Sequence, residues 1–287
     1  MLRVLCSALA LAAVATPTYA DQFRGPGESP WHFRGDFGVP TISLNETAFA
    51  FALELGYFGE SFLIGYDLAQ SVFGRQEGET SNTNFELKNH FVLGYRTGKL
   101  GEARHAFLLE SDFRGLSTDY SGAGFDGSSE SSFLGRQSLV YGYTAAEDGP
   151  LFWGIFVGYG FQAESHSALT FGDAEGEDAS ELTFSGFALA RFIARYELMP
   201  KVVRASFSSE LNLFSMTRSR LYFGDTGADG VEEVTGQRLV NRLTGEVVSF
   251  EALGLHPLVF AGLDVLRTSG SKTDTSVTPV VGIGLTN

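Results

Sequence analysis

Residues 84–96 read NFELKNHFVLGYR, and this stretch decides the fold. Its odd-numbered positions are mostly large and apolar, with Phe85, Leu93 and Tyr95 among them, whereas the even-numbered positions include Glu86 and His90. Side chains that alternate in this way are typical of a β-strand, whose successive residues point to opposite faces. The alternation continues for about twice the length of a usual globular strand, which is about 5–6 residues.

The same period of two recurs along the chain, clearly in 47–57, 106–114, 151–162 and 203–213. One face of these segments is aromatic-rich, and the other carries Gly, Ala and Ser together with charges of both signs. Aromatic residues recur near the segment ends at Tyr57, Tyr66, Tyr95, Tyr141, Tyr143, Tyr159 and Tyr196. The chain contains only four lysines, fewer than water-exposed strands usually show. Long strands with one apolar face and aromatic girdles are the pattern of a transmembrane β-barrel.

On these residues the chain resembles the bacterial outer-membrane β-barrel (porin-like) class over 31–287, although no specific family is identified. The resemblance implies an all-β fold with a single antiparallel transmembrane barrel, short periplasmic turns and longer outer loops. We expect about 12 strands, within a range of 10–12, at 31–44, 47–57, 60–72, 84–97, 103–115, 133–145, 151–164, 182–197, 201–217, 234–243, 246–267 and 275–286. The weakest are the first, which Pro40 interrupts, and 234–243, where alternation is poor.

The connections between these strands alternate in length. Tight turns are expected at 57–60, 97–102, 146–150, 198–201 and 243–246, and longer polar loops at 74–83, 117–132, 167–181, 218–233 and 268–274. The chain ends in Asn287 rather than in the terminal Phe or Trp that is common in the class. A secreted β-sandwich therefore stays open as an alternative fold.

The N-terminus predicts export. Residues 1–20 read MLRVLCSALALAAVATPTYA, in which a basic Arg3, an apolar stretch and a final small Ala20 are typical of a cleaved signal peptide. The remaining 21–287 are then the barrel domain. The single cysteine, Cys6, lies inside the signal, so the mature chain would have no disulfide, and a lipoprotein anchor is not expected. The expected location is the outer membrane of a Gram-negative type cell.

Composition limits the partners. The net charge is −14, and binding of nucleic acid needs a basic surface, so no nucleic-acid partner is expected. Outer-membrane lipid, lipopolysaccharide and the barrel assembly machinery are the expected partners, with small solutes as possible cargo. No cofactor and no metal are predicted, because the acidic runs 173–178 and 225–230 do not match a full calcium-binding loop.

The polar face of the strands supplies the candidate site. The predicted pore-lining residues are Arg96, Glu110, Asp112, Arg114, Arg136, Arg191, Arg195, Arg204, Glu210 and Asp264. Charged rungs in a pore set its selectivity, and Arg191, Arg195 and Arg204 are the predicted anion-facing group. The alternative is that these charges pair across a narrow lumen and offset the cost of their burial.

Catalysis has weaker support, and no catalytic residue is predicted. The most suggestive stretch, Glu164-Ser165-His166-Ser167, lies within a strand pattern, where neighbouring side chains point to opposite faces. The functional expectation is a porin-like channel for small solutes. A membrane-embedded lipid hydrolase and a non-conducting structural or adhesion barrel that acts through its loops are the alternatives.

Overall fold

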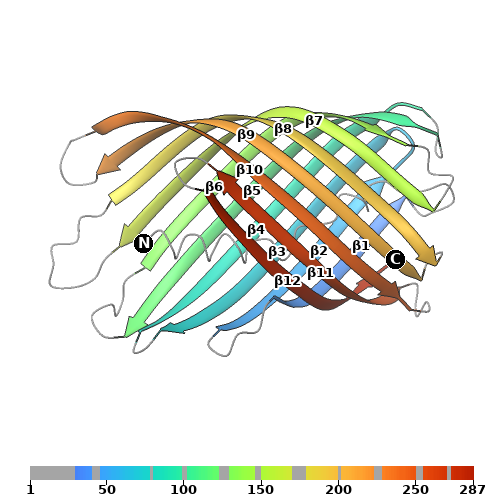
Figure 1. Cartoon of the computed structure of the whole chain (residues 1–287), viewed down its shortest axis with the longest axis horizontal. Coiled ribbons are helices and arrows are strands. Elements are labelled where there is room, and N and C mark those ends of the chain that lie inside the picture. Colours follow the sequence, from blue (N-terminus) through green and yellow to red (C-terminus); the bar gives the residue numbers. More distant parts are fainter. Residues whose placement is uncertain are drawn as a thin grey trace.

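The computed structural model describes residues 30–40, 46–77, 80–98, 102–122, 129–145, 150–169, 179–199, 202–222, 228–249, 255–269 and 273–287. These residues form a closed antiparallel barrel in which each strand pairs with its neighbours in sequence, and β1 pairs with β12 to close the ring (Figure 1). The strands are β1 (Trp31–Pro40), β2 (Glu46–Phe58), β3 (Phe62–Glu77), β4 (Thr80–Arg96), β5 (Arg104–Gly122), β6 (Ser129–Thr144), β7 (Leu151–Leu169), β8 (Ala179–Met199), β9 (Val203–Tyr222), β10 (Ala228–Val248), β11 (His256–Ser269) and β12 (Thr273–Thr286).

The predicted fold class and the preferred count of 12 strands are confirmed. The start of β1 and the end of β12 lie at the same end of the barrel. The backbone N–H of Phe33, near the start of β1, donates to Oδ1 of Asn287 at 2.8 Å. The last strand therefore completes the ring without a terminal aromatic residue. Among the described residues there is no helix of the length and apolarity needed to cross a membrane.

At the end of the barrel with the long loops, the strands extend into polar segments that were expected to be loops. Most of the expected loop 74–83 belongs to β3 and β4, and β5 continues to Gly122. Polar side chains support this pairing: Thr118 donates to Oδ1 of Asn84 at 2.6 Å, and the Ser81 and Ser121 hydroxyls lie 2.6 Å apart. Polarity in these segments therefore marks a barrel wall that continues beyond its apolar band.

One predicted turn is wrong. Residues 243–246 lie inside β10, which runs to Val248 and pairs with β11 up to Leu258. The backbone here stays extended because it has ladder partners on both sides. Gly245 pairs with Ala205 on β9 and with Ala261 on β11.

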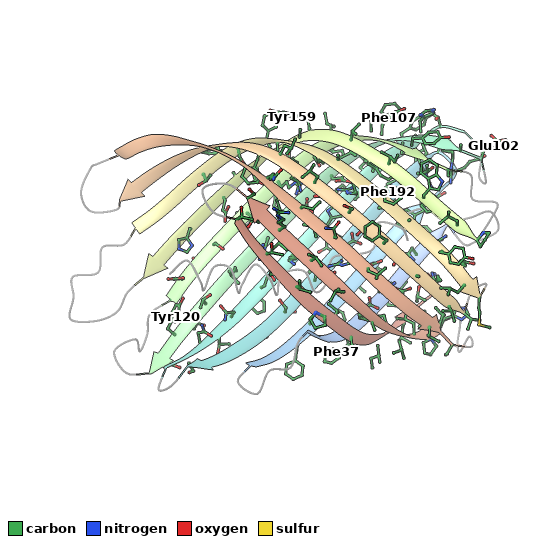
Figure 2. The ribbon with its side chains drawn as sticks, in the orientation of Figure 1. Phe37, Glu102, Phe107, Tyr120, Tyr159 and Phe192 are labelled. Carbon is green, nitrogen blue, oxygen red and sulfur yellow. The ribbon has the colours of Figure 1, made fainter. Side chains whose placement is uncertain are left out.

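The outer face of the barrel is apolar. Phe107, Tyr159 and Phe192 project from the wall, and Glu102 and Tyr120 mark the opposite ends of the barrel (Figure 2). The short-turn end carries a girdle of paired aromatic rings, with Trp31 on Tyr57 at 5.0 Å, Phe62 on Tyr95 at 5.4 Å and Tyr143 on Trp153 at 6.0 Å between centroids. Aromatic rings of this kind lie at a membrane–water interface.

The inner wall uses glycines to accommodate large rings. Gly142, Gly160, Gly236 and Gly282 are the direct cross-strand partners of Phe156, Phe187, Phe214 and Phe260, respectively. A Cβ on Gly142 would lie 2.2 Å from the Phe156 ring, and one on Gly282 would lie 2.3 Å from the Phe260 ring. Each phenyl ring thus covers the backbone of the neighbouring strand, the arrangement known as aromatic rescue of a glycine.

Candidate functional site

Charged side chains fill the middle of the lumen, and a bridge between β5 and β8 is their most extensive contact. Arg191 on β8 donates from Nη1 and Nη2 to the two carboxylate oxygens of Glu110 on β5, at 2.8 and 3.0 Å. Its Nε donates to Glu210 on β9 at 2.8 Å. The Arg191 and Glu110 side chains are 3% and 1% exposed, so this two-pronged ion pair is buried. Such pairs are geometrically specific and stronger than neutral hydrogen bonds.

Arg136 on β6 joins the same network from the other side. Its Nη2 donates to Oδ1 of Asn212 at 2.8 Å, and the Asn212 amide donates to Glu210 at 2.8 Å. The Arg136 guanidinium also lies over the Phe187 ring, 4.0 Å from its centroid. A cation held over an aromatic face is fixed in orientation as well as stabilised. Four strands, β5, β6, β8 and β9, are connected through these contacts.

A second group lies on β4 and β5. The Arg114 guanidinium pairs with Glu86, and Lys88 lies 3.8 Å from the same carboxylate. Two cations therefore share one acid. His90 on β4 pairs with Asp112 on β5, its direct cross-strand partner.

The charges in this middle zone differ in their access to solvent. Lys88 and Arg114 are 18% and 16% exposed, and Glu210 is 19% exposed, in contrast to the almost fully buried Glu110. Polar groups that are partly accessible inside a barrel can contact water in its lumen. The buried pair instead fixes the wall.

Two other predicted site residues have contacts of their own. Asp264 accepts two hydrogen bonds from Arg242, at 2.7 and 2.6 Å. Arg96 donates to the backbone carbonyl of Gly59 at 2.8 Å, beside the short turn between β2 and β3. At this position its guanidinium supports the turn.

The three arginines predicted to face anions have separate surroundings. Arg191 binds Glu110 and Glu210, whereas the Arg195 guanidinium lies 5.8 Å from the centroid of the Phe152 ring. Arg204 on β9 lies between Glu197 on β8 and Glu246 on β10, its direct cross-strand partners. Acidic groups therefore flank two of the three arginines.

Sequence reasoning missed several lumen residues. Arg34 pairs with Asp36 at 2.7 Å and with Glu246 at 2.7 Å, and Arg242 pairs with Asp264. Arg238, also on β10, was missed for the same reason as Arg242: the strand 234–243 alternates poorly. Extending that strand through Gly245 would have placed Arg238, Arg242 and Glu246 on one face.

The serine and histidine residues of the stretch 164–167 lie near the end of β7. Ser131 and Ser167 place their hydroxyls 2.8 Å apart across β6 and β7. His166, one residue away, is paired in register with Ser132 and Glu181 on the neighbouring strands. The described residues contain no group of three or more His, Cys, Asp or Glu side chains placed to hold a metal ion. The acidic run 173–178 and the signal segment 1–20 lie outside the described residues.

Comparisons with known proteins show the fold. No protein-family model matches the chain, and no curated protein matches it. Among solved structures, the translocator domain of autotransporter NalP from Neisseria meningitidis is similar with a TM-score of 0.52 at 14% identity, covering 98% of this chain and 94% of that one. The β domain of the Bordetella autotransporter BrkA gives 0.44 at 14% identity, covering 90% of this chain and 99% of that one. The CymD monoaromatic hydrocarbon channel gives 0.38 at 10% identity, with coverage of 91% and 88%. The fold of this chain is that of the outer-membrane β-barrels.

Proposed function

We propose that this protein is a porin-like channel of the outer membrane, through which small solutes diffuse passively along a charged lumen. The observation that carries the proposal is the partly accessible charged zone in the middle of the barrel, where Lys88, Arg114 and Glu210 are 16–19% exposed. A structural core would bury these groups or replace them by apolar residues. Rings of charged side chains in a pore select among solutes by sign.

The location and processing belong to the same proposal. Residues 1–20 would direct export and be removed, and 21–287 would be inserted by the barrel assembly machinery into a bilayer with an outer leaflet of lipopolysaccharide. The apolar outer face with its aromatic girdle supports this placement. The test is cell fractionation with sequencing of the mature N-terminus. We expect a membrane fraction that requires detergent and a first residue of Asp21. Recovery as a soluble periplasmic protein would contradict the proposed location.

Conduction is tested by insertion of the purified, detergent-refolded barrel into a planar bilayer. We expect steady conductance that rises with salt concentration, because the path is passive and water-filled. A folded barrel is recognised independently by its slower migration on a denaturing gel after heating. Silent bilayers with a folded barrel would reject the channel.

The second candidate is a barrel that does not conduct and acts through its surface. The bridge from Arg191 to Glu110 and Glu210 favours it, because that bridge spans β5 to β9 inside the lumen. A lumen-facing apolar cluster that includes Leu63, Phe156 and Ile193, each at most 1% exposed, also favours it. The bilayer experiment separates the two candidates.

A further inference from the structure

Arg238 is a further cation of the lumen, on the same face of its strand as Arg242. It lies on β10, paired in register with Asn212 on β9 and Thr268 on β11. Its Nε is buried without a hydrogen-bond partner among the described residues, and none of the ion pairs between described residues includes Arg238. The residue as a whole keeps partial exposure, so an anion in the lumen would offset its charge.

Two further guanidinium groups lie near Arg238. Arg136 reaches Asn212, the register partner of Arg238, through its 2.8 Å hydrogen bond, and its own Nε is likewise buried without a partner in the described part of the chain. Arg114 and Arg136 both lie within electrostatic reach of Arg238. Three like charges from β5, β6 and β10 thus converge on the lumen.

The acids in reach of this cluster also have partners outside it. Glu210 accepts hydrogen bonds from Arg191, Asn212 and Arg136, and Asp112 pairs with His90. Glu86 is shared by Arg114 and Lys88. Positive charge is therefore in excess where these arginines meet, although the whole chain has a net charge of −14.

Resting on the proposed function, we infer that Arg114, Arg136 and Arg238 form a binding site for the oxyanion group, carboxylate or phosphate, of a solute in the lumen. The guanidinium fork presents planar N–H donors that match a carboxylate or phosphate edge. The contact of Arg136 with Phe187 fixes one wall of the site before the solute arrives.

The binding test does not require conduction. The urea midpoint of the refolded barrel is measured in detergent at constant ionic strength, with sodium chloride replaced stepwise by sodium phosphate or by sodium acetate. A ligand that binds only the folded state stabilises it by RT ln(1 + [L]/Kd). We expect a higher midpoint in at least one of the two oxyanions. A midpoint unchanged in both would overturn the inference.

Arg238→Gln is the diagnostic variant, and Arg267→Gln is its control, because Arg267 lies on β11 with an exposed side chain. We expect the oxyanion-dependent rise to disappear in Arg238→Gln and to persist in Arg267→Gln. An equal rise in both variants would also overturn the inference. Should Arg238→Gln fail to fold, Arg238→Lys keeps the charge but loses the fork, and we expect it to fold with a reduced rise.

The comparison of the two anions shows which class of anion binds, and the bilayer experiment shows separately whether the barrel conducts. A rise in phosphate alone, in acetate alone or in both would support the site and name the class of anion that it binds. Stabilisation by an oxyanion in a barrel that is silent in the bilayer would reject the channel and leave the site standing. Conductance without any oxyanion effect would leave the channel and reject the site.

Discussion

The guanidinium of Arg136 lies 4.0 Å from the centroid of the Phe187 ring, and that ring occupies its position because Gly160 is the residue opposite it. A Cβ on Gly160 would lie 2.5 Å from the ring and 2.3 Å from the Gln137 carbonyl oxygen. The absence of one methyl group on β7 thus determines where a lumen cation on β6 lies.

We therefore expect Gly160→Ala to destabilise the barrel by about 1–3 kcal/mol, the usual cost of overpacking. Urea unfolding of the refolded protein measures this loss. Gly115→Ala is the matched control, because a Cβ there meets nothing within 4 Å. Equal midpoints for the two variants would contradict the packing of Phe187 against Gly160.

Removal of Arg191 tests the buried bridge. In Arg191→Gln the Glu110 carboxylate keeps its burial, at 1% exposure, but loses both of its guanidinium hydrogen bonds. We expect a loss of about 3–5 kcal/mol, as for other broken buried pairs. Adding Glu110→Gln should recover part of that loss, since no unpaired charge then remains. A double variant less stable than the single one would show that the bridge is not the source of the effect.

Arg204 and Arg238 are expected to respond differently to a change of charge. Arg204→Glu places a third carboxylate between Glu197 and Glu246, so it should lower stability by roughly 1–3 kcal/mol. Its effect on the reversal potential in asymmetric salt should be small. Arg238→Glu should move that potential toward cation selectivity. A larger shift in reversal potential for Arg204→Glu than for Arg238→Glu would assign the selectivity to Arg204 instead.

The strands were predictable where the membrane enforces alternation. In 84–96 one face contacts lipid and the other faces the lumen, so apolar and polar residues alternate along the sequence. In β10 the pattern fails because Gly245 has no side chain and Asn241 is polar. There the ladder with β9 and β11 holds the strand, and such pairing is not visible in the local sequence.

The lumen residues were predictable as a set but not as pairs. Alternation places Glu110 and Arg191 on the inner face, yet their contact joins β5 to β8 across 81 positions of sequence. Only the curvature of the closed sheet brings them together. The loops were overestimated for a related reason: polar residues such as Ser81 and Ser121 suggested coil, although in the barrel they pair across strands.

The position of the apolar band can be tested with a single arginine. Leu139 on β6 is 69% exposed on the outer face, between Tyr141 toward the short turns and Phe133 toward the long loops. An arginine near the bilayer midplane costs a barrel about 2–4 kcal/mol, whereas near the interface the cost falls to about 0–1 kcal/mol.

We expect Leu139→Arg to show the larger cost when the barrel is refolded into phospholipid vesicles and unfolded in denaturant. Ser131→Arg, eight positions along the same strand and beyond Phe133, should show the smaller cost. Because the side chain of Ser131 bonds to the hydroxyl of Ser167 and to no other described side chain, its replacement removes little else. If both variants lost the same stability, the apolar band would not end between Phe133 and Ser131, and the extension of β6 above the membrane would be wrong.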